Sequence, residues 1–157
     1  MVRKVVLGAL LVSSSVAVAA PPPAFLRTAI RGNFSEVTLG RMIENRGSTG
    51  QVRRFGSMLV TDHSKGLAQA QQIAARLRLR IATTLTPEAR AEQVTLRHLS
   101  GRAFDREVRR YMINDHRMDI AAFKAQARSG DRATAGYAAA TVPVMQKHLA
   151  MAQALRG

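Results

Sequence analysis

The feature that most constrains the fold is a helical spacing of apolar residues that continues along almost the whole chain. Apolar side chains recur three and four positions apart, and no stretch alternates between apolar and polar residues as a half-buried strand does. The spacing stops at Gly47, at Ser100-Gly101 and at Ser129-Gly130, which are residues typical of helix ends. The chain has 157 residues, 46% of them apolar, which suits one globular domain. The sequence therefore predicts an all-α fold.

Four long helices and one short helix account for this spacing. We expect the long helices at about residues 24–46, 49–79, 102–128 and 132–155, and the short one at about 87–99. Asp131 is the expected cap of the last helix, while Gly32-Asn33 and Pro143 are places where a helix can be interrupted or kinked. The roughly 20 residues between the second and third long helices can return the chain along the bundle. This predicts a ferritin-like four-helix bundle with a short connecting helix.

The first 19 residues have the features of a secretory signal peptide. Arg3 and Lys4 precede an apolar run from Val5 to Val12, and Ala17-Val18-Ala19 supplies the small residues that a signal peptidase accepts. We expect cleavage after Ala19, which leaves residues 20–157 as a single domain in the periplasm or otherwise outside the cytoplasm. An uncleaved N-terminal anchor is the alternative, although the run is shorter than the ~20 residues that a spanning helix needs.

Composition excludes several kinds of site. The chain has no cysteine, which removes disulfides, thiolate metal ligands, iron–sulfur clusters and cysteine nucleophiles. It has no tryptophan and only 4% aromatic residues, which argues against a carbohydrate-stacking cleft and against an aromatic platform for nucleic acid. Catalytic serine motifs, Gly-rich phosphate loops and dinucleotide-binding fingerprints are absent from the sequence. No motif identifies the chain as an enzyme.

The charge of the chain is strongly basic. Loss of Arg3 and Lys4 with the signal peptide leaves 22 basic and 10 acidic residues, a net charge of +12. The usual explanation of scattered arginines is that they solvate the outer helix faces, and this is the interpretation that we favour. The alternative is attraction of an exported protein to anionic envelope surfaces such as lipid head groups, and Arg76, Arg78 and Arg80 do gather at one expected helix end. We expect no nucleic-acid partner.

Each long helix carries one ligand-type residue on its apolar stripe. These residues are Glu36, His63, His116 and His148. On the second helix, for example, Phe55 and Leu59 precede His63 at a spacing of four, and Leu67 follows it. At ~1.5 Å of rise per residue, Glu36 and His63 differ in height by only about 4–5 Å across the turn between their helices. One carboxylate and three imidazoles are therefore expected to meet near the middle of the bundle.

The order of the motifs along the chain resembles that of a known family. The motifs are Glu36-Val37-x-Leu39-Gly40-Arg41, Val52-x-x-Phe55 to Met58, Asp62-His63, Leu99-Ser100-Gly101-x-x-Phe104-Asp105, Asp115-His116, and Pro143 with His148-Leu149. This pattern is similar to the exported bacterial domain-of-unknown-function family four-one-four-two, from about Phe25 to Leu155. The resemblance implies a ferritin-like helical bundle. It implies no activity and supplies no functional residues.

Two functions from different classes fit these residues. In the first, the Glu/His3 set binds one divalent transition metal ion, either Zn, Cu, Fe or Mn, as imidazole and carboxylate ligands allow. Asp62 and Asp115 are then candidates to orient the histidines through hydrogen bonds. In the second, the four residues form a metal-free buried polar layer, with Glu36 ionised against an imidazole, in a non-catalytic basic protein of the cell envelope.

Di-iron chemistry of the ferritin type is disfavoured. Di-iron carboxylate bundles use Glu-x-x-His on two helices, and this sequence contains no such motif. Met112 and Met145 lie one turn from His116 and His148, but methionines at helical spacing are more typical of core packing than of a copper site. His98 has no partner in the sequence pattern, so we expect it at the surface.

Overall fold

The computed structural model describes residues 18–156, which form five α-helices and contain no strand. The helices are α1 (Pro22–Arg46), α2 (Gly50–Arg76), α3 (Pro87–His98), α4 (Gly101–Ala127) and α5 (Ala135–Ala154). The predicted all-α fold, with a short connecting helix, is confirmed. Within residues 18–156, no helix is both long enough and apolar enough to cross a membrane. The predicted signal peptide lies almost entirely outside the described residues.

Several helix ends differ from the prediction. Helix α1 continues through Gly32-Asn33, because the Asn33 side chain donates a hydrogen bond to the Ala29 carbonyl one turn back and is satisfied within the helix. Helix α2 ends at Arg76, and Arg78 adopts a left-handed backbone conformation that a helix cannot continue. Helix α5 begins only at Ala135, and Pro143 lies inside it without breaking it.

The turn before α5 explains why Asp131 does not cap that helix. The Asp131 carboxylate accepts hydrogen bonds from the backbone nitrogens of Ala133 and Thr134, at 3.3 and 3.1 Å. These bonds close a separate turn that follows Gly130, whose positive φ of 73° suits a residue without a side chain. The expected cap therefore stabilises this turn and not the helix.

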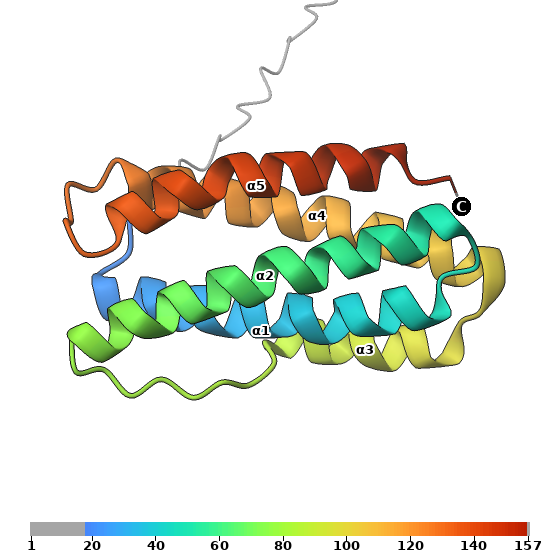
Figure 1. Ribbon diagram of the computed structural model, residues 1–157, viewed down its shortest axis with the longest axis horizontal. Coiled ribbons are helices and arrows are strands. Elements are labelled where there is room, and N and C mark those ends of the chain that lie inside the picture. Colours follow the sequence, from blue (N-terminus) through green and yellow to red (C-terminus); the bar gives the residue numbers. More distant parts are fainter. Residues whose placement is uncertain (1–17, 157) are drawn as a thin grey trace, which may run out of the picture.

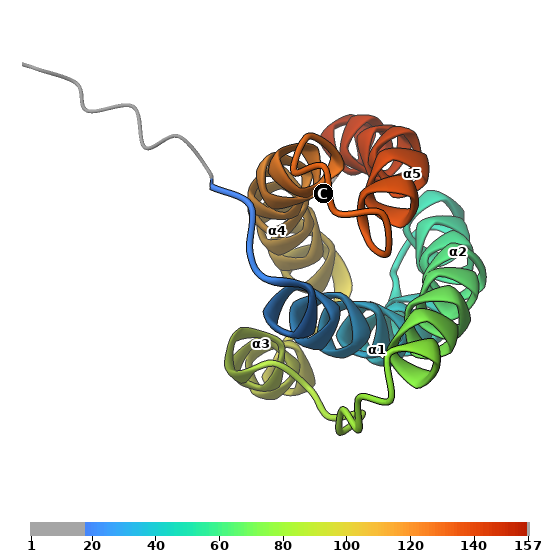
Figure 2. The same ribbon diagram turned by 90° about the vertical axis from the view of Figure 1, so that its left-hand side faces the viewer.

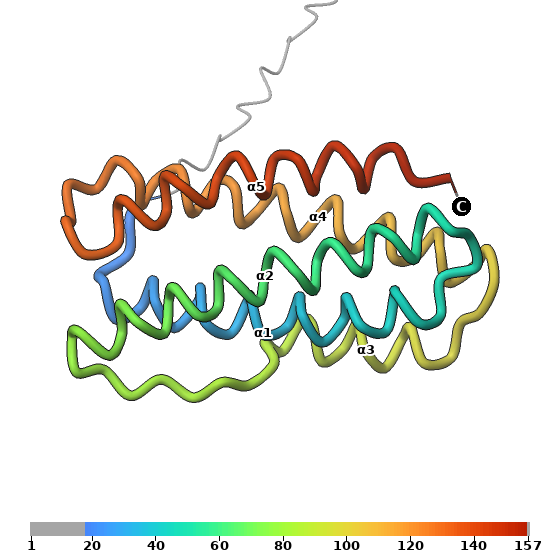
Figure 3. Tube along the Cα trace, in the orientation of Figure 1, coloured from blue at the N-terminus to red at the C-terminus, as the bar shows by residue number. Residues whose placement is uncertain are grey.

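The chain crosses the length of the bundle once between α2 and α4. Figure 1 and Figure 3 show α1 and α5 running in one direction and α2 and α4 in the other, with α3 and the extended segment 77–86 returning the chain between them. Two hydrogen bonds hold this crossover against α1. Arg31 donates to the Leu85 carbonyl at 2.6 Å, and the Thr86 amide donates to Ser35 Oγ at 3.0 Å. One crossover connection is the topology expected from the sequence.

The bundle consists of two helical hairpins, α1–α2 and α4–α5. Packing is closest within each hairpin and much sparser between α2 and α5 or between α1 and α4. Gly40 and Gly56 bring α1 and α2 together: a Cβ atom on Gly56 would lie 2.4 Å from the Glu44 nitrogen and 2.7 Å from the Gly40 carbonyl oxygen. Helix α3 packs against α1 and α4 outside the four long helices (Figure 2).

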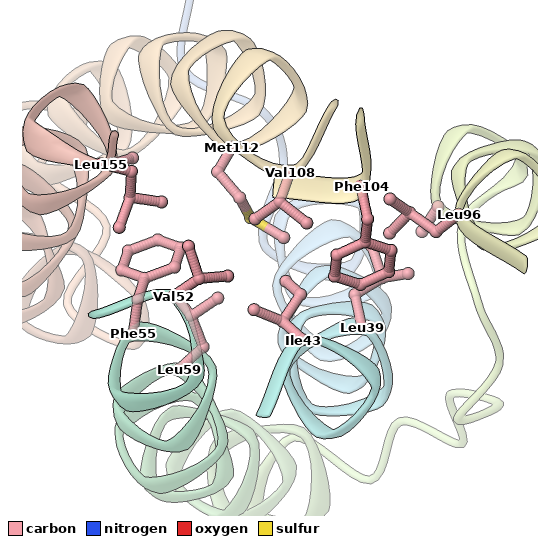
Figure 4. Packing of buried hydrophobic residues seen from close by; sticks show 12 residues of the cluster. Leu39, Ile43, Val52, Phe55, Leu59, Leu96, Phe104, Val108, Met112 and Leu155 are labelled. Atoms are coloured by element: carbon pink, nitrogen blue, oxygen red, sulfur yellow. The ribbon is translucent and has the colours of Figure 1, made fainter. Parts of the chain in front are cut away.

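A polar layer divides the interior into two hydrophobic clusters. One cluster surrounds Phe55, Phe104 and Met112 near the α1–α2 turn (Figure 4), and the other surrounds Phe25 and Phe123 at the opposite end. In each long helix the residues between the two clusters include one buried ligand-type side chain. These are Glu36, His63, His116 and His148. The helical stripes predicted from the sequence therefore do face one interior.

Candidate metal centre

Three imidazoles converge in the polar layer. His63 from α2, His116 from α4 and His148 from α5 are 5%, 2% and 0% exposed. One ring nitrogen from each lies within 4.8 Å of the other two. The ring centroids are separated by 5.8 Å between His63 and His116, 5.1 Å between His63 and His148, and 5.4 Å between His116 and His148. Three nitrogens this close can act as ligands to one ion.

A chain of hydrogen bonds fixes the His63 ring. Asn33 donates through Nδ2 to the Ala29 carbonyl at 2.7 Å and to the Tyr137 hydroxyl at 3.1 Å, and Tyr137 donates in turn to the Gly66 carbonyl at 3.2 Å. The Asn33 amide is therefore oriented with Oδ1 as its acceptor, which lies 3.1 Å from His63 Nδ1. His63 must carry its proton on Nδ1, which leaves Nε2 with a free lone pair.

The other two rings are oriented in the same way. His116 Nδ1 donates to the Met112 carbonyl, one turn back on α4, at 3.1 Å. His148 Nε2 donates to Asp62 Oδ2, also at 3.1 Å. Both protons therefore point away from the centre. His116 Nε2 and His148 Nδ1 are left facing each other at 3.3 Å.

The three imidazoles are held in their neutral form. Burial, followed by the proximity of His148, lowers the pKa of His116 to about 3. Burial also lowers the pKa of His63 well below its usual range, with repulsion from His116 and His148 adding to the effect. The pKa of His148 is lowered by burial, although the Asp62 carboxylate opposes the shift. Neutral rings with outward protons present three inward lone pairs, the form in which histidine binds a metal.

Glu36 completes the polar layer from α1. The residue is 3% exposed, and its Oε2 atom lies 4.0 Å from His63 Nε2. Neither of these two atoms has a hydrogen-bond partner. Burial and the nearby charge of Asp115 raise the pKa of Glu36 well above its usual range. An unpaired carboxylate oxygen beside an unpaired imidazole nitrogen is costly in a protein interior.

Two further carboxylates, both on α4, lie beside Glu36. Glu36, Asp115 and His116 each place one ligand atom within 4.8 Å of the others. Asp119 follows one turn later, and burial with the charge of Asp115 raises the pKa of Asp119 to about 7. We refer to Glu36, Asp115 and Asp119 as the acidic cluster. It lies on the α1–α4 side of the polar layer.

The structure brings together the four side chains predicted from the sequence and places the two predicted orienting residues, Asp62 and Asp115, in different surroundings. Asp62 contacts His148 as expected. Asp115 belongs to the acidic cluster instead, since consecutive helical residues point about 100 degrees apart and the His116 Nδ1 proton goes to a backbone carbonyl. His98 is exposed as predicted, and Met112 and Met145 pack in the two hydrophobic clusters.

A cavity of about 270 Å³ opens between α2 and α5 on the other side of the layer. Asn33, Asp62, His63, His148 and Val144 are among the residues that line it. Asn33 accepts the hydrogen bond from His63 Nδ1, and Asp62 accepts the one from His148 Nε2. The cavity therefore lies beside the hydrogen bonds that orient His63 and His148, whereas His63 Nε2 remains buried.

Comparison with known proteins identifies the family but no function. The family model described as Domain of unknown function (DUF4142) matches residues 9–155. The chain belongs to this family. No curated protein and no solved structure matches the chain. Since the family description assigns no activity, the function has to be inferred from the residues of the polar layer.

Proposed function

We propose that this chain is an exported metal-binding protein that holds one divalent transition metal ion in the middle of its helical bundle. The ligands are His63 Nε2, His116 Nε2, His148 Nδ1 and Glu36 Oε2. Such a site crosslinks the two hairpins, because Glu36 and His63 belong to one hairpin and His116 and His148 to the other.

The observation that carries the proposal is the contact between His116 Nε2 and His148 Nδ1. Both atoms bear lone pairs when the outer nitrogens donate their hydrogen bonds, yet they lie 3.3 Å apart. Two lone pairs at this distance repel each other unless a cation or a proton lies between them. The lowered pKa values of both rings disfavour the proton. A metal ion relieves the repulsion and also satisfies the unpartnered atoms of Glu36 and His63.

The donor set indicates which ions the site would take. Three imidazole nitrogens and one carboxylate oxygen suit Zn²⁺, Cu²⁺, Fe²⁺ or Mn²⁺, with affinity for the divalent ions following the usual order of first-row metals. The hydrogen bonds to Asn33, Met112 and Asp62 are of the kind that orient metal-bound histidines. The arrangement supports metal binding and assigns no reaction to the site.

Thermal unfolding of protein purified without a histidine tag tests the proposal. A ligand that binds only the folded state raises the melting temperature by mass action. Wild type and His116→Ala would be compared in EDTA and in Zn²⁺, Cu²⁺, Mn²⁺ and anaerobic Fe²⁺, with bound metal counted by elemental analysis. We expect one equivalent of metal and a higher melting temperature for wild type only. Identical wild-type curves in all five conditions would leave the metal-free polar layer as the better account.

A basic envelope-associated role is the second candidate. Arg76, Arg78 and Arg80 are all exposed where α2 ends and the crossover begins. Attraction of these residues to anionic lipid head groups depends on charge and is screened by salt. Binding to vesicles that contain phosphatidylglycerol at low salt, lost at high salt, would support this role. Salt-independent binding would contradict it.

A further inference from the structure

We propose that the cavity between α2 and α5 is the route by which the metal ion enters and leaves the histidine centre. The inference rests on the proposed function, because it concerns how the ion reaches those ligands. Asp62 attracts the ion at the cavity wall, and the rings of His63 and His148 move aside to let it pass inward. The contact with Asp62 is transient, and the bound ion keeps the four ligands already named.

The first support is that the cavity ends at two of the four proposed ligands. His63 and His148 both line it, and their ring centroids are 5.1 Å apart. His148 donates through Nε2 to Asp62, another lining residue, while Nδ1 of the same ring faces His116. An ion in the cavity is therefore one imidazole ring away from the centre.

The second support is the size and polarity of the cavity. Its volume is about 270 Å³. Six water molecules take up roughly 180 Å³ at ~30 Å³ each, so a divalent ion can enter with its hydration shell. Asn33, Gln69 and Thr141 place polar side chains along the lining, among the apolar ones. The ion is therefore not forced to shed all its water at the entrance.

The third support is the charge at the cavity wall. Among the described residues that line the cavity, Asp62 is the one carboxylate, and its side chain is 24% exposed. Asp62 Oδ2 accepts the bond from His148, whereas Oδ1 lies 3.9 Å from the ammonium of Lys65. The Lys65 side chain is 72% exposed, so this ion pair is solvated and weak. A divalent cation can displace the lysine from Asp62.

The fourth support is the packing around the centre. Hydrophobic clusters fill both ends of the bundle, around Phe55 at one end and Phe123 at the other. An ion moving along the bundle axis would have to cross one of them without water, which is costly. Helix α3 packs against both α1 and α4, whereas α2 and α5 meet in a sparse seam. Passage through that seam requires only a local movement of rings.

A removable obstruction tests the route. The chain contains no cysteine, so one introduced thiol can be labelled selectively with a bulky maleimide after folding. Val144→Cys places the label at the cavity, on a residue that is 37% exposed. Glu88→Cys is the matched control. Glu88 is exposed on α3, on the α1–α4 side, where its charge adds to burial in raising the pKa of Asp115.

Uptake is followed with Co²⁺, whose visible absorption changes when imidazoles replace water. Stopped-flow mixing gives the association rate, and transfer to excess chelator gives the release rate. We expect labelled Val144→Cys to take up and release Co²⁺ roughly tenfold or more slowly than labelled Glu88→Cys and wild type. The dissociation constant should stay the same, because an obstructed route slows both directions equally.

The charge at the entrance provides a second, independent measurement. Lys65→Gln removes a positive charge beside Asp62 and should speed Co²⁺ uptake about twofold at low salt, an effect that high salt screens. Lys124→Gln makes the same change in net charge at an exposed position on α4 and should leave the rate unchanged. Equal rates for the two lysine variants would contradict entry past Asp62.

The outcomes separate this inference from the proposed function. If wild type binds no Co²⁺ at equilibrium, the histidine centre is wrong and the route fails with it. If wild type binds Co²⁺ but the label on Val144→Cys changes neither rate, the centre stands and the route is wrong. Slower uptake only in labelled Glu88→Cys would place the entrance between α1 and α4 and also overturn the route. Circular dichroism confirms that each labelled protein remains helical.

Discussion

His148 donates its Nε2 proton to Asp62 at 3.1 Å, and this bond turns Nδ1 of the same ring toward His116. The contact joins α5 to α2 across the sparsely packed seam between the hairpins. It lies at the wall of the cavity, where the Asp62 side chain is 24% exposed. Asp62 therefore controls the orientation of a proposed ligand without being one.

Asp62→Asn should weaken metal binding without unfolding the protein. Loss of the carboxylate charge lowers the basicity of the His148 ring. Removing a hydrogen-bond partner of a metal-binding histidine typically weakens metal affinity about 10–100-fold. Competition with a chromophoric chelator measures the affinity, and Glu44→Gln controls for the change in net charge. The melting temperature in EDTA should change little, because Asp62 is partly solvated. An affinity equal to that of wild type would show that the Asp62 bond is incidental.

Tyr137→Phe should destabilise the metal-free protein by about 1–2 kcal/mol. The substitution keeps the aromatic ring in its cluster but leaves the Gly66 carbonyl and one Asn33 N–H without their buried partner. Urea unfolding in EDTA, followed by circular dichroism, gives the change in the free energy of unfolding. Because Asn33 also orients His63, the affinity for metal should fall in the same variant. Unchanged stability would mean that water replaces the hydroxyl.

Gly56→Ala should be among the most destabilising small substitutions in α2. The new methyl group would meet backbone atoms of α1 at 2.4–2.9 Å, which neither helix can avoid without separating. We expect a loss of about 3 kcal/mol or more, at the upper end of overpacking costs. Gly136→Ala is the matched control, because nothing lies within 4 Å of its added Cβ. That variant should gain about 0.5–1 kcal/mol from helix propensity. Urea unfolding of both proteins makes the comparison.

Asp119→Asn should change how stability depends on pH in the absence of metal. The pKa of Asp119 is raised from 3.8 to about 7 on folding. Between these values the folded protein holds a proton that the unfolded chain has released, so this group reduces stability as pH rises through that range. The asparagine in the variant does not titrate, so the variant does not lose stability in this way as pH rises. In EDTA it should be more stable than wild type by about 2 kcal/mol near pH 8, with the difference disappearing near pH 4.

The histidines do not obscure that comparison. Their lowered pKa values act in the opposite direction, since protonation of the unfolded chain below about pH 6.5 reduces stability on the acid side. This contribution is common to wild type and Asp119→Asn and cancels in the difference between them. Unfolding curves for both proteins at four or more pH values provide the measurement. A difference that does not vary with pH would contradict the raised pKa of Asp119.

The sequence predicted the helices and the four central residues because both follow from local spacing. Glu36 and the three histidines occupy stripe positions, and a stripe determines which side chains face inward. The partners of these residues depend on how the helices are rotated against each other. Asn33 fits the stripe between Ala29 and Glu36, which is the signal that could have identified it, but its polar side chain was equally consistent with an interruption of the helix.

Asp115 and Asp119 show why the rest of the site was harder to predict. Both lie beside the core stripe of α4, in a position where the sequence pattern alone cannot distinguish a solvated face from a contact with α1. Their proximity to Glu36 arises only from tertiary packing, where α4 lies against α1 in the bundle. The role of Tyr137 also depends on tertiary packing, because its hydroxyl on α5 donates a hydrogen bond to the Gly66 carbonyl on α2.

The division into two hairpins has a consequence for the order of folding. Contacts within α1–α2 and α4–α5 are local in sequence and can form early, whereas contacts between the hairpins join distant parts of the chain and form late. Each hairpin alone supplies only two of the four proposed ligands. The complete site therefore exists only after the last step of assembly. For the exported metal-binding protein that we propose, the ion would be acquired in the compartment where the chain finishes folding, and not in the one where it is synthesised.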